Sequence, residues 1–200
     1  CHKPVDWRFN LFYTRLSSNI QPKTASLSRR QILRGMVGLF AALPWPSVAC
    51  AATMPLRQST PPMSTTIRDK DGKPLSLNGF WGMPLLINFW ATWCPPCVAE
   101  LPALDRASHT LAGEVKILLI SVDRGGSKKA LPFLRDRGIS HPHFAFDANG
   151  ALSREMGVRG LPTSYLVTAD QHHCWTYQGP REWDELAVIA ELRRLLEGHG

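Results

Sequence analysis

The sequence has 200 residues, enough for one globular domain with extensions, and a formal net charge of +7. Most of that charge lies in residues 1–51, whereas the acidic and basic side chains of residues 52–200 nearly balance. A nearly neutral body argues against the basic surface that nucleic-acid binding needs, so we expect no nucleic-acid partner. The five cysteines are too few for a disulfide-stapled secreted scaffold.

Residues 1–51 have the layout of an export signal. The pair Arg29–Arg30 precedes a short apolar stretch at 36–43, and small residues follow up to Ala51. The arginine pair resembles the signal read by the Tat translocase. We expect cleavage after Ala51 and a periplasmic or other extracytoplasmic location. The alternative is an uncleaved leader that tethers the protein to the membrane. The apolar stretch at 36–43 is short for this, because a membrane span needs about 20 apolar residues.

The mature chain begins with a segment rich in proline, serine and threonine at 52–65, which we expect to be a flexible tether. A folded domain should follow over 66–200. It starts with a β-hairpin over 66–77, because Asp71-Gly72 is a turn signal between two short extended runs.

A buried strand followed directly by a cysteine pair is the central feature of this domain. The apolar run at 84–90 predicts the strand, and the composition of 98–111 predicts a helix after it. Cys94 and Cys97 lie at the junction, with Pro95 and Pro96 between them. Proline fits the first helical turn, where its missing N–H costs no hydrogen bond.

This position suits dithiol–disulfide exchange. The free N–H groups and the positive dipole end of a helix stabilise a thiolate. We therefore interpret Cys94 as the attacking nucleophile and Cys97, one turn into the helix, as the resolving thiol. A zinc site is the competing interpretation, but no second pair of ligands follows at finger spacing, and we expect no metal.

The remaining elements predict an α/β domain with a mixed sheet. We expect strands at 115–122, 164–167 and 174–177, a short strand or loop at 141–146, and helices at 128–137, 151–156 and 183–196. The apolar set of the last helix comprises Leu186, Ile189, Ala190, Leu192, Leu195 and Leu196.

Several other polar or reactive residues have ordinary structural interpretations. We interpret Cys174 as a buried thiol in a strand and Asp123 as a helix cap after a strand. Arg181 and Asp184 are interpreted as surface residues near the last helix.

Three ordered motifs carry a resemblance to a known family. They are WATWCPPC at 90–97, the segment V-x-G-x-P-T within 157–163, and G-x-x-x-W formed by Gly179 and Trp183. Over roughly 66–196 the chain resembles the TlpA/ResA-like exported thiol–disulfide oxidoreductases. The resemblance implies a thioredoxin-like fold, with a central mixed sheet flanked by helices and an N-terminal hairpin extension.

The resemblance also implies roles for individual residues. Pro162 would be a cis-proline that leaves the backbone of Leu161 free to bond a partner chain. Glu100, three residues after Cys97, would tune the thiols and move their protons as a half-buried carboxyl with a pKa near 7. Asn88 stands where thioredoxin carries a buried aspartate, so more of the proton transfer would fall to Glu100.

Trp93, beside Cys94, and the two prolines between the cysteines, Pro95 and Pro96, would then belong to the surface that meets the partner.

The predicted function is reduction of disulfides in client proteins, such as apocytochrome c thiols, with electrons returned by a membrane thiol donor and no cofactor. A copper- or haem-delivery module on the same fold is the alternative, although copper chaperones of this kind typically use C-x-x-x-C. A peroxidase is a weaker third reading, since Ala91 stands where its threonine is required.

Overall fold

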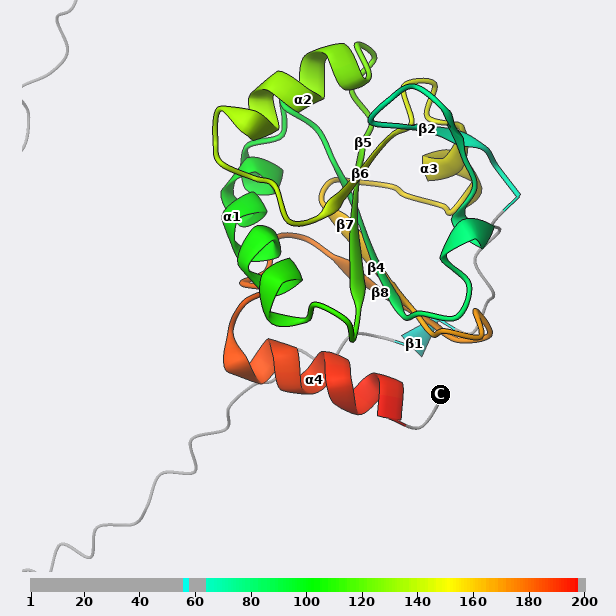
Figure 1. Ribbon diagram of the computed structural model, residues 1–200, viewed down its shortest axis with the longest axis vertical. Helices are drawn as coiled ribbons and strands as arrows, with labels where there is room; N and C mark the ends of the chain where they lie inside the picture. Colours follow the sequence, from blue (N-terminus) through cyan, green and yellow to red (C-terminus); the bar gives the residue numbers. More distant parts are fainter. Residues whose placement is uncertain (1–55, 58–63, 198–200) are drawn as a thin grey trace, which may run out of the picture. The chain divides into compact units, whose positions relative to one another are not determined.

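The structure is a computed structural model that describes residues 56–57 and 64–197 (Figure 1). The predicted export signal at 1–51 lies outside the described residues, as does most of the predicted tether. Within the described part of the chain, no helix has the length and hydropathy to cross a bilayer.

Strands and helices alternate through most of the domain. In chain order the elements are β1 (Leu56–Arg57), β2 (Ile67–Asp69), β3 (Pro74–Leu75), the 3₁₀ helix η1 (Leu77–Phe80), β4 (Leu85–Trp90), α1 (Pro95–Thr110), β5 (Lys116–Ser121), α2 (Ser127–Arg135), β6 (His143–Phe146), α3 (Ala151–Glu155), β7 (Thr163–Val167), β8 (Cys174–Gln178) and α4 (Leu186–Glu197).

The strands form one sheet in the order β1-β8-β7-β4-β5-β6-β2-β3. The central strand β4 pairs in parallel with β5 and antiparallel with β7. The hairpin of β2 and β3 extends the sheet beyond β6. The predicted α/β architecture with a mixed sheet and an N-terminal hairpin is therefore confirmed.

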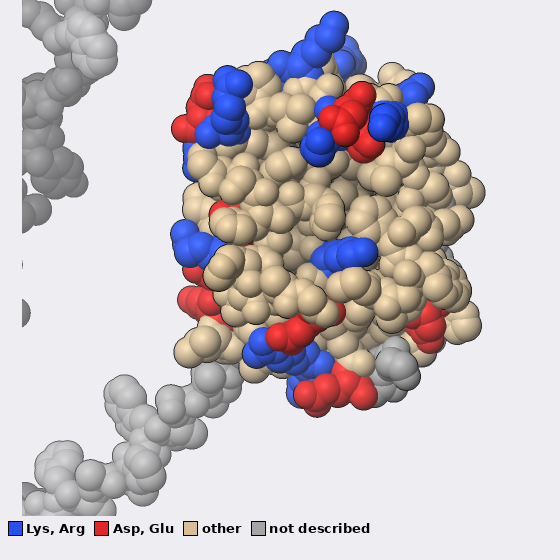
Figure 2. All heavy atoms as spheres, viewed as in Figure 1, with Lys and Arg blue, Asp and Glu red and all other residues tan. Residues whose placement is uncertain are grey.

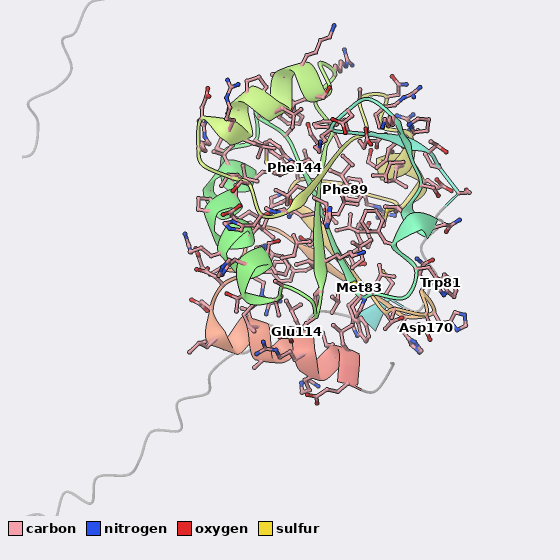
Figure 3. All side chains as sticks on the ribbon, viewed as in Figure 1. Trp81, Met83, Phe89, Glu114, Phe144 and Asp170 are labelled. Atoms are coloured by element: carbon pink, nitrogen blue, oxygen red, sulfur yellow. A yellow bond between two sulfur atoms is a disulfide. The ribbon has the colours of Figure 1, made fainter. Side chains whose placement is uncertain are left out.

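Strand β4 is buried on both faces, as its continuous apolar run indicates. Leu86 and Trp90 join one hydrophobic cluster, which includes residues of α1, α2 and α4. Ile87 and Phe89 join the other cluster, which includes residues of η1 and α3. Figure 1 shows α1 and α2 on one side of the strands and α3 on the other. Phe89 lies deep in the interior in Figure 3.

Two boundaries differ from the sequence-based expectation. Leu56–Arg57, inside the predicted tether, pair with β8 as a short antiparallel strand. Helix α4 begins at Leu186 rather than Trp183, and Leu186 is 85% exposed. Ala190 is also exposed, so neither residue belongs to the buried face, which Val188, Ile189 and Leu192 form instead. Trp183 itself is fully buried in the segment before the helix.

The charged groups on the surface are mixed in sign. In Figure 2, acidic and basic side chains lie next to one another at the upper and lower ends of the face shown. Mainly uncharged side chains occupy the region between them. This arrangement matches the balanced charge of residues 52–200.

Candidate active site

The cysteine pair lies where β4 gives way to α1. Cys94 is the N-cap of α1, and a disulfide joins it to Cys97 across a Cα–Cα distance of 5.3 Å. The main-chain N–H of Cys97 donates to Cys94 Sγ over 3.4 Å. After reduction, this donor and the helix N-terminus would stabilise a thiolate on Cys94 more than one on Cys97.

The two sulfur-bearing residues differ in access to solvent. Cys94 is 5% exposed and Cys97 is fully buried. Around Cys94, the side chains of Trp93, Pro95 and Pro96 are exposed, with Trp93 at 63%. An approaching chain would therefore meet Cys94 and this apolar rim first.

The peptide bond between Leu161 and Pro162 is cis. The antiparallel register pairs Thr163 on β7 with Phe89 on β4, so Pro162 lies beside Trp90, where β4 leaves the sheet for the cysteines. Leu161 packs against the hydrophobic cluster that contains both cysteines. The fold thus brings together the two sequence motifs that were expected to form one site.

Glu100 is buried on the same helix as Cys97, one turn further on. Its Oε1 accepts a hydrogen bond from Asn88 Nδ2 at 2.7 Å. Its Oε2 accepts two, from the main-chain N–H of Arg181 at 3.0 Å and from Trp183 Nε1 at 3.1 Å. Three segments far apart in sequence therefore meet at one carboxyl group.

Burial raises the pKa of Glu100 to about 7, against the lowering effect of these three hydrogen bonds. The nearby charge of Glu182 adds a smaller raising effect. The side chain is only 3% exposed, so the half-buried position expected from the sequence is wrong. A carboxyl group with this pKa can take up or release a proton near neutral pH.

Asn88 belongs to the face of β4 that meets α1. Its amide nitrogen also donates to Ser164 Oγ on β7 at 3.0 Å. A carboxyl group at position 88 would compete with Glu100 for protons. The Asn88 amide instead donates a hydrogen bond, which favours the ionised form of Glu100.

Asp123 anchors the loop that carries the cysteines, a role that the sequence reading missed. It accepts hydrogen bonds from the main-chain N–H of Thr92 at 2.8 Å and from Thr92 Oγ1 at 2.7 Å. Ser121 and Lys129 also bind its carboxylate. The predicted helix cap is wrong, because the N-cap of α2 is Gly126. The signal that could have revealed this role is the parallel pairing of β4 and β5, whose carboxyl ends meet at one sheet edge.

The pKa of Asp123 reflects two opposing effects. Burial by itself would raise it, but the hydrogen bonds from Thr92, Lys129 and Ser121 together bring it below its ordinary value. The carboxylate is therefore ionised at neutral pH and holds Thr92, two residues before Cys94.

Arg181 is not a surface residue as expected. Its side chain is 8% exposed and forms an ion pair with Glu191 of α4, which is 10% exposed. Asp184 is closer to the expectation, since it pairs with the largely exposed Arg106 at 2.6 Å. Cys174 is buried in β8, as predicted.

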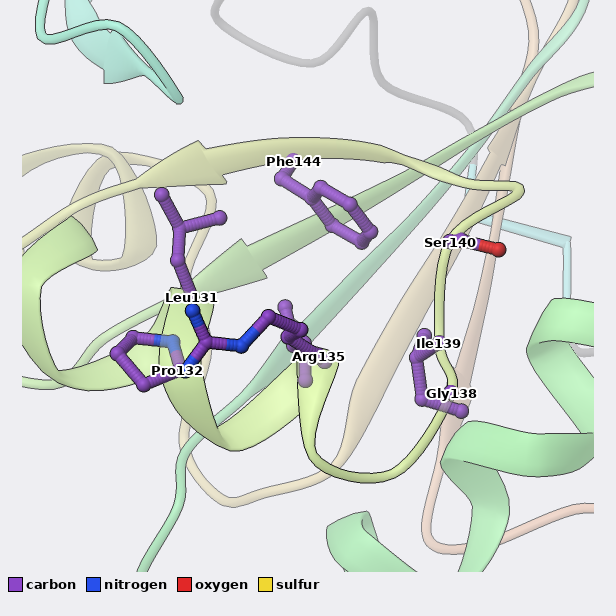
Figure 4. Close-up of a pocket in the computed structure, with 8 residues that line it drawn as sticks. Leu131, Pro132, Arg135, Gly138, Ile139, Ser140 and Phe144 are labelled. Atoms are coloured by element: carbon purple, nitrogen blue, oxygen red, sulfur yellow. The ribbon is translucent and has the colours of Figure 1, made fainter.

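A separate depression of about 390 Å³ lies between α2 and β6 (Figure 4). Leu131, Arg135 and Phe144 are among its lining residues. None of the predicted site residues line it.

Comparison with known proteins assigns the chain to a family. The Redoxin family model matches residues 55–192. The chain belongs to the Redoxin family. This assignment agrees with the resemblance carried by the cysteine, cis-proline and tryptophan motifs.

Two curated relatives of this Redoxin chain are named as thiol–disulfide proteins. It is 36% identical over 124 residues to the thiol:disulfide interchange protein DsbE of Vibrio cholerae, covering 60% of this chain and 65% of the relative. It is 31% identical over 105 residues to the thiol-disulfide oxidoreductase ResA of Bacillus thuringiensis, covering 52% and 60%. The chain thus spans less than two thirds of the length of these relatives.

Solved structures confirm a thioredoxin-like fold. A putative DsbE from Chlorobium tepidum superposes with a TM-score of 0.57 at 24% identity, covering 71% of this chain and 94% of that one. A thioredoxin-family thiol:disulfide interchange protein from Chlorobium tepidum TLS gives 0.55 at 27% identity, with coverage of 68% and 98%.

Replacement of Glu100 by glutamine should change how stability depends on pH. Because folding raises the pKa of Glu100 from 4.5 to about 7, the wild-type chain loses stability relative to the variant as pH rises through this window. The loss should be on the order of 3 kcal/mol. Urea unfolding of the oxidised protein at pH 4.5 to 8 measures it. The exposed Glu185→Gln serves as the control, and parallel curves for Glu100→Gln and wild type would refute the argument.

Asp123→Asn should loosen the cysteine loop. At pH 7 we expect the free energy of unfolding to fall by about 1–3 kcal/mol, because buried partners of the carboxylate lose a charged acceptor. Since the pKa of Asp123 is lowered in the fold, the deficit should shrink as pH falls below about 4. Denaturant unfolding at pH 7 and pH 3 tests this, with the exposed Asp136→Asn as control. A deficit that is equal at both pH values would contradict the role of the charge.

Proposed function

We propose that this protein is an exported thiol–disulfide oxidoreductase that reduces disulfides in client proteins. The observation that carries the proposal is the Cys94–Cys97 disulfide at the start of α1, in a fold that also puts a cis-proline beside the end of β4. The names of the DsbE and ResA relatives support the same chemistry.

The proposed reaction begins with the reduced pair. The Cys94 thiolate attacks one sulfur of a client disulfide, the client S–S bond breaks, and the other client sulfur leaves as a thiolate that takes a proton. Cys97 then loses its proton and attacks Cys94 Sγ, which releases the second client thiol. The client gains two electrons and two protons, and the pair becomes the disulfide seen in the structure.

Glu100 is the proposed acceptor of the Cys97 proton. It lies one turn after Cys97 on α1, and burial brings its pKa to about 7. A carboxyl group with such a pKa can hold a proton in one step and release it in the next at physiological pH.

The proposed client surface is the rim around Cys94. Trp93, Pro95 and Pro96 offer exposed apolar contacts, and Leu161 next to the cis bond offers its backbone to an extended chain. The relation to ResA and DsbE makes apocytochrome c thiols a candidate client. We propose that a membrane thiol donor returns the electrons, because no reductant is built into the reaction itself.

The proposed location is periplasmic or otherwise extracytoplasmic, reached by a Tat-like signal over residues 1–51 that is cleaved after Ala51. An uncleaved leader would instead tether the same domain to the membrane. The copper- or haem-binding alternative would use the two thiols as ligands; the described residues hold no group of three histidine, cysteine or acidic side chains that could bind a metal.

Serine variants of the two cysteines should separate their roles. Cys94→Ser should abolish reduction of a model disulfide, because the attacking sulfur is gone. Cys97→Ser should leave a stable mixed disulfide with the client, visible by non-reducing electrophoresis and mass spectrometry. The buried Cys174→Ser should retain activity. Continued disulfide reduction by Cys94→Ser would refute the assignment of Cys94 as the attacking nucleophile.

The direction of the reaction depends on the potential of the pair. In a full chain with Cys1, Cys50 and Cys174 replaced by serine, only Cys94 and Cys97 titrate in poised thiol buffers, followed by tryptophan fluorescence. We expect a two-electron midpoint below about −230 mV, which suits a client reductant. A midpoint above about −180 mV would instead indicate an oxidant or isomerase.

A further inference from the structure

We propose that the buried Arg181–Glu191 ion pair is a positioning device for the active site. It holds the segment before α4 against Glu100 and so determines which carboxyl oxygen carries the exchangeable proton. The role in proton transfer rests on the proposed function, whereas the contacts of Arg181, Glu191 and Glu100 do not depend on it.

The two oxygens of Glu100 have different surroundings. Oε2 accepts from two N–H groups, those of the Arg181 main chain and the Trp183 indole. Neither nitrogen has a lone pair available to accept a proton in return. A proton on Oε2 would find no acceptor among these donors, so we assign the proton of the neutral form to Oε1.

Oε1 faces a group that can serve both protonation states. In the structure, Asn88 Nδ2 donates to Oε1, while the buried Asn88 Oδ1 has no hydrogen-bond partner in the described part of the chain. Rotation of the amide by half a turn would bring Oδ1 to Oε1, where it accepts the proton of the neutral acid. The hydroxyl of Ser164 can likewise reverse from acceptor to donor toward the same amide.

Both Oε2 donors belong to one short segment, which Arg181 ties to its surroundings. Its guanidinium pairs with Glu191 of α4 and lies 4.9 Å from the ring centroid of Tyr177 on β8. It also lies 5.5 Å from the ring centroid of Trp183. The side chain thus links β8, α4 and the donor tryptophan, and a shift of Arg181 would move both donors together.

Besides the Asn88 amide, which can reorient, the segment that carries both Oε2 donors is the other influence on the protonation of Glu100. Asn88 and Ser164 on the sheet are neutral, and Cys97 on α1 is held in the disulfide. The acidic Glu182 lies within the segment itself. Donors at Oε2 favour the ionised carboxyl, so their displacement must raise its titration midpoint.

The test follows the carboxyl carbon of Glu100 by ¹³C NMR in the oxidised, full-length chain from pH 5 to 9. Its signal is assigned by its absence in Glu100→Gln. Trp183→Phe keeps an aromatic side chain, although a smaller one, and removes one Oε2 donor, so it gives a reference for the expected upward shift. Glu191→Gln should raise the midpoint by about one pH unit, which corresponds to about 1.4 kcal/mol.

Glu114→Gln is the matched control. Glu114, in the turn after α1 (Figure 3), also pairs with an arginine of α4, Arg193, at 2.7 Å, but this pair is about half exposed. The control should leave the midpoint unchanged. An unchanged midpoint in Glu191→Gln, or an equal shift in Glu114→Gln, would overturn the proposal.

Glu191→Gln leaves Arg181 buried without its charged partner, which is strongly destabilising and could prevent folding, so a second variant is needed. The double change Arg181→Met with Glu191→Leu removes the pair without leaving either charge unpartnered. It should also raise the midpoint, and an unchanged midpoint would refute the proposal independently. Because the titration needs no client, a chain that shows the shift but reduces no disulfide would refute the proposed function and leave the positioning pair intact.

Discussion

The hydrogen bonds to Glu100 join parts of the chain that are otherwise far apart. Asn88 comes from the central strand, Glu100 from the helix of the cysteines, and Arg181 and Trp183 from the segment before the last helix. A carboxyl group this deeply buried would stay neutral far above neutral pH without donors, and it would be readily ionised if it were exposed. The balance between desolvation and three hydrogen bonds leaves its pKa at about 7.

The same balance explains why the end of the domain matters to a site formed near its start. Trp183 is fully buried with its indole N–H on Glu100, and α4 begins three residues later at Leu186. Arg181 and Glu191 then hold that turn against the helix. On the proposal above, a change in α4 would affect the cysteines through this carboxyl group.

On the other side of the cysteines, Asp123 plays a comparable structural role for the loop. The carboxyl ends of β4 and β5 are adjacent because the strands are parallel, and Asp123 at the end of β5 reaches Thr92 after the end of β4. Asp123, after β5, therefore holds the loop at Thr92, and Asn88 of β4 holds α1 at Glu100. Together these contacts fix Cys94 at the helix N-terminus. In the proposed reaction an exchange partner must reach Cys94, which is 5% exposed and has the exposed Trp93 beside it.

The sequence by itself determined most of the elements and the position of the cysteine pair at the start of a helix. The apolar run at 84–90, the prolines between the cysteines and the Asp71-Gly72 turn are local signals, and each predicted the element that the structure contains. They succeed because strand burial, the first helical turn and hairpin turns depend on neighbouring residues.

Only the tertiary structure decided the partners of the buried charges. The sequence predicts Arg181 at the surface, Asp123 as a helix cap and Trp183 at the start of a helix, because a charge or an aromatic ring carries no local sign of its distant partner. Their burial depends on contacts across the sheet and between α1 and α4. The extent of Glu100 burial, and hence its pKa, depends on those same long-range contacts, which no spacing along the chain encodes.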